Sequence, residues 1–114
     1  MQQMYAEDAV LDVSAVFTDV GPMRGHDDML GYWLELRETW AGLRLDPIEV
    51  LDVGNGRYVV DLRLSGKGRS SGAEVDQRFA FIYTMRGNKV IRAELLPDLT
   101  AAIATAESSA RQTA

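Results

Sequence analysis

Four strand-like segments follow one another in the second half of the chain, and this run constrains the fold more than any other feature. Each segment is rich in β-branched or aromatic residues; the four are residues 44–53, 57–65, 74–85 and 89–96. Gly54-Asn55-Gly56 and Gly87-Asn88 are typical of tight turns, and the glycine-rich stretch 66–72 is typical of a looser hairpin loop. Because such short connections join antiparallel neighbours, the run predicts a four-stranded antiparallel meander.

A helix pattern precedes this meander. Its apolar residues recur at helical spacing and form one stripe, which we expect to be buried: Met29, Trp33, Leu36 and Trp40. Asp27 or Asp28 begins the helix, because carboxylates are favoured at the positive end of the helix dipole. The helix ends near Gly42. Pro47 interrupts the following strand early, which favours an edge position in the sheet.

The remaining segments complete an α+β pattern. Residues 1–6 are interpreted as the last turn of a helix, residues 9–14 as the first strand, and residues 15–25 as a loop that contains Gly21-Pro22. Pro97-Asp98 begins a short closing helix. This order predicts the α+β class, with a curved, mostly antiparallel sheet that wraps around helices on one of its faces. The sheet and its helices then enclose a cone-shaped space.

Length and composition bound the domain and its partners. The 114 residues predict a single domain over residues 1–106 and a small, polar, flexible tail over residues 107–114. The chain has no cysteine, which excludes disulfides and thiolate chemistry. Its net charge of −5 is unfavourable for a nucleic-acid partner. The first residues lack a signal-peptide pattern and no apolar run approaches about 20 residues, so we expect a cytoplasmic protein without membrane contact.

Four longer stretches carry a family resemblance through their order and spacing. They look like a first strand entered from a helical segment, an arginine–glycine turn into a pocket helix, a last hairpin and a closing helix: MYAEDAVLDVS, MRGHDDMLGYW, EVDQRFAFIYTMRGNKVIRAELLPD and PDLTAAIA. Together they span most of residues 4–106. The chain resembles the SnoaL-like group of the nuclear transport factor 2-like superfamily, which also holds the ketosteroid isomerases and limonene-epoxide hydrolases. The resemblance implies the cone-shaped, cystatin-type roll of that superfamily.

The resemblance also indicates that one element is largely missing. Members of the superfamily begin with a long helix that packs across the open mouth of the cone, and this chain starts after the position of that helix. Three explanations stay open: a late start, a domain without this cover, or cover supplied by a partner. We therefore expect an incompletely covered pocket or an exposed apolar patch near the N-terminus.

Side-chain alternation divides the long strand 74–85 into two faces. The resemblance places one of these faces toward the pocket, namely Gln77, Phe79, Phe81 and Tyr83. It adds pocket residues from the other elements, namely Val13, Trp33, Trp40, Ala93 and Leu95. This set predicts a mostly aromatic, apolar cavity in which Gln77 is the polar anchor. The alternative interpretation is that the same aromatic residues fill the core.

The resemblance further implies where a steroid isomerase would carry its catalytic groups. The carboxylate base matches Val13, the acid matches Phe81, and a helix-borne tyrosine matches Trp33, while the hydroxyl donor would lie on the missing helix. Each of these positions is apolar or absent. We therefore do not expect steroid-isomerase-type catalysis, and any chemistry is limited to acid–base or cyclase-like steps.

Asp12 and His26 are the two weak candidates for a catalytic role. Asp12 lies next to Val13, so alternation turns it to the outer face, or it caps the following loop, unless a bulge shifts the register. His26 precedes the helix, where it bonds free backbone N–H groups, faces the pocket mouth, or acts as a general base. His26 with Asp27 and Asp28 is not a convincing metal site, because adjacent helix positions point about 100° apart. We expect no metal and no cofactor.

The outer face of the predicted sheet mixes charged and apolar residues. Asp61 and Arg63 share this face, and a hydrolase of the superfamily would need an Asp–Arg–Asp arrangement to activate water. We interpret them instead as part of a cross-strand charge ladder with Arg78, Arg92 and Glu94. The apolar positions among these charges are Val59, Ala80, Ile82 and Leu96. Relatives commonly dimerise through this surface, so we expect a homodimer through the outer sheet face.

These observations favour a SnoaL-like domain with an apolar pocket that binds a small hydrophobic molecule. The alternative is a non-catalytic dimerisation or binding module with a filled core. Transport of RNA or protein has only an analogy of fold behind it. Whether the domain is an enzyme stays open.

Overall fold

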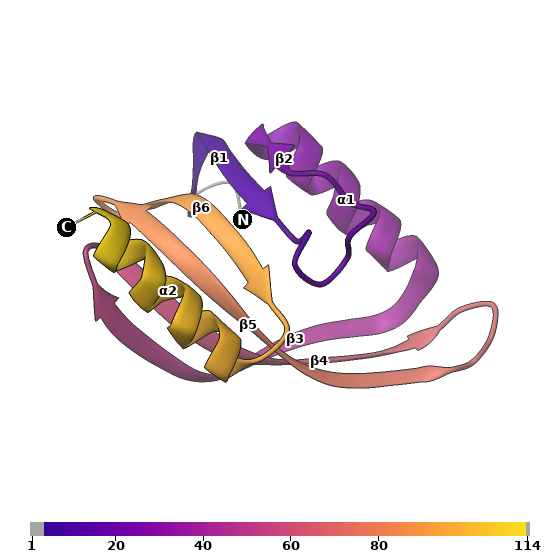
Figure 1. Cartoon of the computed structure of the whole chain (residues 1–114). Coiled ribbons are helices and arrows are strands. Elements are labelled where there is room, and N and C mark those ends of the chain that lie inside the picture. The colour runs from indigo at the N-terminus through magenta and orange to yellow at the C-terminus, as the bar shows by residue number, and fades with distance from the viewer. Residues whose placement is uncertain (1–3, 114) are drawn as a thin grey trace.

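One six-stranded sheet and two helices make up the described part of the chain (Figure 1). The computed structural model describes residues 4–113, with side chains through residue 108. The elements are β1 (Tyr5–Asp12), β2 (Met23–Arg24), α1 (Gly25–Thr39), β3 (Trp40–Gly54), β4 (Arg57–Gly68), β5 (Glu74–Arg86), β6 (Lys89–Leu96) and α2 (Leu99–Thr113). The strand order is β2-β1-β6-β5-β4-β3, and β1 and β6 are its only parallel pair among the described residues. The α+β class is confirmed.

The antiparallel meander is confirmed as β3 to β6. β3 and β4 meet at a turn in which Asn55 and Gly56 have positive φ of 58° and 72°. A Cβ at position 56 would also lie 3.1 Å from the Met85 carbonyl oxygen, so glycine suits both the backbone and the space there. Pro47 lies in the edge strand β3, as its missing N–H predicts.

The glycine-rich hairpin loop is shorter than predicted. β4 continues through Gly68, and only residues 69–73 remain between β4 and β5. Arg69 fastens this tip to the end of α1: its backbone N–H donates to the Thr39 carbonyl oxygen at 3.0 Å, and its Nε donates to the Arg37 carbonyl oxygen at 3.0 Å. The last carbonyl groups of a helix lack partners within the helix, and a cation is favoured there. The hairpin tip therefore holds the end of α1.

The predicted stripe lies on the cavity side of α1, but only Met29 is buried, Trp33 and Leu36 are half-buried, and Trp40 belongs to β3. Both helix ends differ from the prediction. α1 begins at Gly25, two residues before Asp27, and the backbone N–H of Arg24 donates to the Asp28 carboxylate at 3.2 Å. At the other end Trp40 is already extended, with φ −121° and ψ 130°, and it begins β3. Met29 is the most deeply buried residue of the stripe.

The N-terminal region is a strand where a helical turn was predicted. β1 begins at Tyr5, so the prediction was wrong for Tyr5 and Ala6, while residues 1–3 lie outside the described part of the chain. Parallel pairing with β6 extends the strand: Tyr5 is opposite Val90, whose N–H donates to the Met4 carbonyl oxygen at 2.7 Å. The short β2, inside the predicted loop, pairs with β1. Such pairing to distant strands leaves no local pattern in the sequence.

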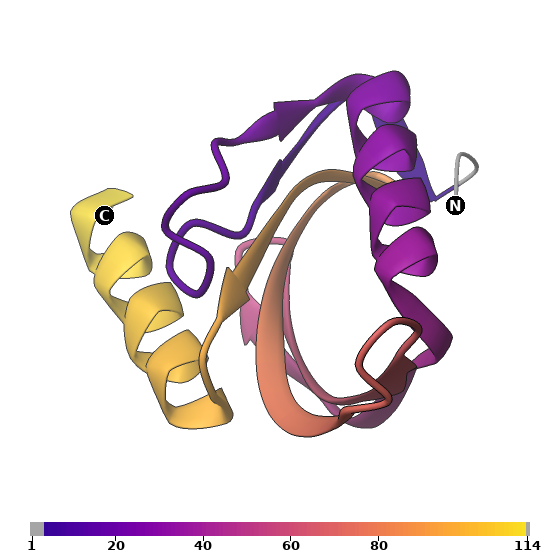
Figure 2. The same ribbon diagram turned by 90° about the vertical axis from the view of Figure 1, so that its right-hand side faces the viewer.

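The closing helix α2 lies on the convex face of the sheet, opposite to α1 (Figure 2). The prediction that the helices share one face was therefore wrong. The core between α2 and the sheet consists of Val59, Ala80, Ile82, Leu96, Ala102 and Ala106. The alanine side chains of α2 let the helix approach the strands closely. The α2 backbone is helical through Thr113, while the flexibility of residues 107–114 stays a prediction.

This packing corrects the reasoning behind the expected homodimer. The four apolar residues of the outer face, Val59, Ala80, Ile82 and Leu96, are buried within one chain. They do not form an open interface, because α2 covers them. A homodimer through the remaining, charged part of this face stays a prediction. No helix in residues 4–113 combines the length and the apolar character needed to span a bilayer.

Candidate functional site: an apolar cavity under α1

A cavity of about 650 Å³ lies between α1 and the concave face of the sheet and is partly open to solvent. β1 with the loop after it, α1, and β3 to β6 contribute its walls. The lining residues are almost all apolar or aromatic, namely Tyr5, Leu11, Val13, Phe17, Val20, Met29, Tyr32, Trp33, Leu36, Trp40, Leu43, Leu45, Leu62, Leu64, Val75, Gln77, Phe79, Phe81, Tyr83 and Leu95. This volume lies within the usual range of small-molecule sites, about 300–1,000 Å³.

The structure brings most of the predicted pocket residues to this cavity. Alternation along β5 turns four of them inward, and the other elements add four more: Gln77, Phe79, Phe81, Tyr83, Val13, Trp33, Trp40 and Leu95. Ala93 is the exception. It shares the concave face but is completely buried between its sheet neighbours Tyr83 and Leu11. That a ligand occupies this space stays a prediction.

Gln77, the predicted polar anchor, lies on the exposed rim of the cavity rather than in its interior. Its position follows from the register of the sheet, because it pairs with Leu64 near the solvent-facing end of the β4–β5 hairpin. Solvent competes for the hydrogen bonds of an exposed amide. Gln77 is therefore placed to contact a molecule at the entrance of the cavity rather than in its interior.

Two tyrosines from separate strands line the cavity. Tyr5 comes from β1 and Tyr83 from β5. Burial raises the pKa of both phenols. The role of Tyr5 was missed, because residues 1–6 were interpreted as a helical turn. The register of β1 shifts between Tyr5 and Val10, so simple alternation counted from Leu11 would not have placed Tyr5 in the cavity wall.

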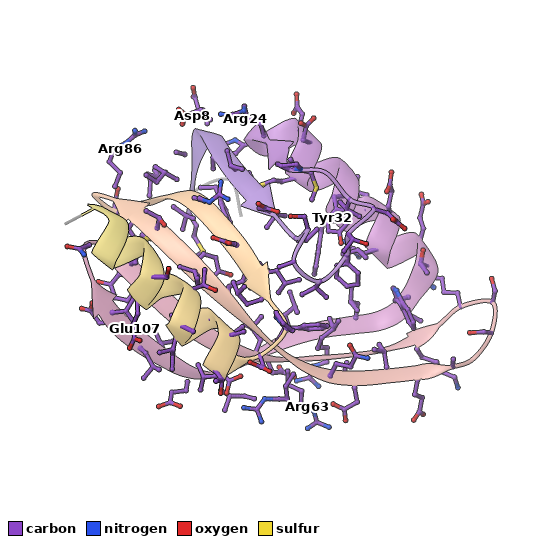
Figure 3. The ribbon with its side chains drawn as sticks, viewed as in Figure 1. Asp8, Arg24, Tyr32, Arg63, Arg86 and Glu107 are labelled. Carbon is purple, nitrogen blue, oxygen red and sulfur yellow. The ribbon has the colours of Figure 1, made fainter. Side chains whose placement is uncertain are left out.

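Aromatic residues from separate elements pack around the cavity. The rings of Phe81 and Tyr83 stack at a centroid distance of 5.3 Å. The ring centroid of Phe17, from the loop after β1, lies 6.3 Å from that of Phe79. Figure 3 shows Tyr32 between α1 and the loop that follows β1. Burial, followed by the charge of Glu35, raises the pKa of Tyr32. The loop residue Phe17 was not predicted to line the cavity.

Asp12 does not line the cavity. Its Oδ1 accepts hydrogen bonds from the Ser14 backbone N–H at 3.0 Å and the Ser14 hydroxyl at 2.6 Å, and its Oδ2 accepts one from Arg92 at 3.1 Å. The Ser14 side chain and backbone are the main causes that lower the pKa of Asp12, and Arg92 also lowers it. This is the predicted outer-face carboxylate that caps the following loop. A carboxylate held as an ionised acceptor outside the cavity is poorly placed as its general base.

His26 joins α1 to β1 and also lies outside the cavity lining. Its Nε2 is 2.9 Å from the Tyr5 carbonyl oxygen, which can only accept, so Nε2 carries the proton and donates. The interpretation that the ring bonds backbone N–H groups was therefore wrong. The histidine instead ties the start of the helix to the strand residue whose side chain enters the cavity.

The charged residues of the outer face pair with one another. Asp61 is only 3% exposed and forms an ion pair with Arg78, while Arg63 pairs with Asp76 through Nε at 2.7 Å. Figure 3 shows Arg63 pointing away from the cavity. The hydrolase-type arrangement is absent from the cavity, because Asp61 and Arg63 face the other side of the sheet. In the described residues, no three His, Cys, Asp or Glu side chains gather as a metal site.

The concave face continues beyond the cavity as an exposed apolar surface. Val50 and Tyr58 are 60% and 37% exposed, and they pair with the inward-facing Val60 and Tyr83. This surface adjoins the cavity, because Tyr83, the partner of Tyr58, also lines it. The open side of the cavity agrees with the expected incompletely covered pocket.

Solved structures with low sequence identity share this fold. An NTF2-like protein from Burkholderia thailandensis E264 superposes with a TM-score of 0.77 at 23% identity, over 94% of this chain and 82% of its own. A hypothetical protein with a ketosteroid isomerase-like fold from Catenulispora acidiphila DSM 44928, solved in complex with trimethylamine, superposes with a TM-score of 0.74 at 11% identity. The match covers 92% of this chain and 78% of that protein. A putative SnoaL-like polyketide cyclase from Jannaschia sp. CCS1 superposes with a TM-score of 0.72 at 20% identity. The match covers 92% of this chain and 74% of that protein.

The sequence comparisons address the family directly. No curated protein sequence matches the chain. The family model of the SnoaL-like domain, however, matches residues 1–93, which include β1, α1 and the meander up to the middle of β6. This match covers most of the chain and agrees with the fold that the solved structures share. The chain therefore belongs to the SnoaL-like domain family.

Proposed function

We propose that this SnoaL-like domain binds a small, neutral, hydrophobic molecule in the cavity under α1. The observation that carries the proposal is the lining: about 650 Å³ of space is surrounded by apolar and aromatic side chains, and no Asp, Glu, Lys, Arg or His is among the described residues that line it. Transferring a matching apolar surface from water into such a space is favourable by roughly 25 cal/mol per Å². An ion would lose its hydration there without gaining a partner.

The same lining favours binding over proton transfer. A general base works best when its pKa lies near the operating pH. The titratable groups in the cavity are phenols, and burial raises the pKa values of Tyr5, Tyr32 and Tyr83 away from neutrality. Asp12 and His26 are both engaged outside the lining. Acid–base or cyclase-like chemistry would therefore depend on groups that the bound molecule itself brings.

The alternative of a module with a filled core has less support. The aromatic residues that could have filled the core, such as Phe81 and Tyr83, stand in the cavity wall and leave the space open. Part of the concave face also remains exposed, at Val50 and Tyr58. An apolar space that its own side chains leave open favours a ligand as its occupant.

A pair of variants on one strand tests the proposal with the neutral dye N-phenyl-1-naphthylamine, whose emission rises in an apolar site. Leu64→Trp places a larger side chain into the cavity, while Arg63→Trp makes a bulky change at the next residue, on the opposite face. We expect Leu64→Trp to weaken dye binding at least about fivefold and Arg63→Trp to change it less than about twofold. The measurement is a fluorescence titration with the dye excited directly.

The matched control separates the cavity from the outer surface. Arg63→Trp removes an exposed ion pair with Asp76, which is worth little in stability. Equal affinities of the two variants, or a wild-type protein that fails to bind the dye saturably, would contradict the proposed function.

A further inference from the structure

Hydrogen bonds tie both ends of α1 to the sheet, so that the helix lies lengthwise along β5. At the start of α1, His26 Nε2 donates to the Tyr5 carbonyl oxygen at 2.9 Å. Tyr5 pairs with Val90 of β6, and Val90 pairs with Met85 near the end of β5. At the end of α1, Arg69 donates to two carbonyl oxygens of the last helical turn, and it lies in the hairpin tip that leads into β5. The helix and the strand therefore run in opposite directions, side by side.

The strand is much longer than the helix to which its ends are linked. From His26 to Thr39 the helix rises roughly 20 Å. From Glu74 to Met85 the strand has a contour of roughly 36 Å. Because its two ends are held near the two ends of the shorter helix, the strand must curve away from α1 between them. Figure 2 shows the strands of the meander curving away from α1 in this way.

The cavity under α1 follows this curve and is longer than it is wide. Val75 and Tyr83 both line it, and the stretch of β5 between them is roughly 26 Å long. On the helix side the lining runs from Met29 to Trp40, which corresponds to roughly 16 Å at the rise of a helix. A sphere of 650 Å³ would be only about 11 Å wide. Only an elongated molecule can contact the whole lining.

Water reaches this lining at the hairpin end. Three of the described lining residues are exposed, namely Phe17, Leu45 and Gln77. Leu45 and Gln77 lie on either side of Leu64 in one row across β3, β4 and β5. The ring of Phe17 packs near that of Phe79, two residues after Gln77 in β5. The entrance of the cavity is therefore at this row, next to the hairpin.

The opposite end of the cavity is better covered. Its row across the sheet contains Leu11, the completely buried Ala93 and Tyr83. Leu11 and Tyr83 are half-buried, as is Tyr5, which is tied to the start of α1. An apolar group gains most where water is excluded, whereas a polar group loses least where it stays hydrated. The two ends of the cavity thus suit the two ends of an amphiphilic molecule.

We propose that the ligand is an elongated molecule with one apolar chain and one uncharged polar end, such as a long-chain alcohol. The chain lies along β5 with its tail toward Leu11 and Tyr83, and the polar end stays hydrated at the entrance beside Gln77. This inference rests on the proposed function, since it specifies the ligand of the same cavity. Each methylene group that enters the cavity buries further apolar surface, so the affinity grows with chain length until the tail reaches Leu11.

A series of primary alcohols tests the proposed shape. 1-Hexanol, 1-octanol, 1-decanol and 1-dodecanol compete with N-phenyl-1-naphthylamine for the full chain, and 9-fluorenone serves as a compact probe in the same assay. We expect the affinity of the wild-type protein to rise about two- to fourfold per methylene group. Leu11→Trp shortens the space for the tail. It should change 1-hexanol binding less than about twofold and weaken 1-dodecanol binding at least about tenfold.

Val10→Trp is the matched control, because Val10 is the neighbour of Leu11 in β1 and does not line the cavity. It should leave the whole series unchanged within about twofold. If circular dichroism shows that Leu11→Trp does not fold, Tyr83→Trp makes the same test from the other side of the row. Affinities that do not depend on chain length, or a tryptophan variant that weakens every alcohol equally, overturn the proposal while the dye and 9-fluorenone still bind. If the wild-type protein binds neither of these two, the proposed function itself fails.

The position of the polar end has its own test. 1-Octanol and 1-chlorooctane have the same chain and differ in the group at its end. We expect Gln77→Leu to reduce the preference for the alcohol about two- to threefold, because the amide can no longer exchange a hydrogen bond with it. The effect is small because solvent competes at the exposed entrance. A preference that Gln77→Leu leaves unchanged overturns the placement of the polar end beside Gln77.

Discussion

Replacing Val13 with aspartate should lower the free energy of unfolding by about 3 kcal/mol or more at pH 7. Val13 is almost completely buried, lines the cavity and packs in one cluster with Phe79 and Leu95. An ionised carboxylate there would lose its hydration and find no cationic partner in the lining. The variant also introduces a carboxylate at the position that the resemblance matched to the base of the steroid isomerases.

The Val13→Asp penalty should depend on pH in a definite direction. Burial raises the pKa of the introduced carboxyl group in the folded state above its unfolded value of about 3.9. The folded state then binds the proton more tightly, so the penalty is fully present above the folded pKa and shrinks as pH falls toward the unfolded value. Between the two pKa values each pH unit changes stability by about 1.4 kcal/mol. Urea unfolding at pH 7 and pH 5 measures this change.

Val13→Asn is the control for this prediction, because asparagine has nearly the same shape as aspartate but no titrating group. The difference in stability between the aspartate and asparagine variants should narrow from pH 7 to pH 5. A difference that stays constant over this range would mean that residue 13 is open to water, and the buried cavity wall described above would be wrong at this point.

Ile82→Ala should be the most destabilising simple truncation on the convex face, at about 3 kcal/mol. Ile82 is 3% exposed and lies in the core between the sheet and α2. The loss combines the transfer free energy of the removed methyl and methylene groups with the cavity that they leave. Chemical unfolding followed by circular dichroism gives the value.

Ile48→Ala makes the same chemical change at a residue of β3 that is 50% exposed. It should cost less than about 1 kcal/mol. Similar losses in the two variants would contradict the assignment of α2 to the convex face, since Ile82 would then be no better buried than Ile48.

The fold was largely predictable, because its strongest signals are local. The turns at residues 54–56 and 87–88 and the alternation along β5 define the meander, and β6 has the predicted bounds Lys89–Leu96. The helical spacing of the α1 stripe predicted which side of that helix faces the sheet. These patterns depend on residues close together in the chain.

The parts that were mispredicted depend on contacts between distant residues. Tyr5 extends β1 because it pairs with Val90, and no pattern within residues 1–6 indicates that pairing. The face that α2 covers was also not evident, since alternation separates two faces without showing which element packs on each. Apolar residues such as Ile82 were therefore assigned to a partner chain when α2 supplies the cover.

In the candidate site, too, local patterns predicted some features while contacts between distant residues decided others. Alternation and the family resemblance together predicted eight residues that line the cavity, Phe81 and Leu95 among them. Gln77, the predicted polar anchor, lies in the cavity wall at its exposed rim near the end of the hairpin, because a polar residue on the inward face need not lie in the interior, and its role as an anchor stays a prediction. Two tyrosines that line the same cavity, Tyr5 and Tyr83, are 78 positions apart in the sequence, so no local pattern connects them.

A crystal structure of this chain grown with 9-fluorenone tests the central claim most directly, because it shows what the cavity under α1 contains. We expect one ketone molecule between α1 and the concave face, with its rings against Trp33 and Phe81. A cavity closed by its own side chains, or a ketone bound only at the outer surface of the sheet, would contradict the account.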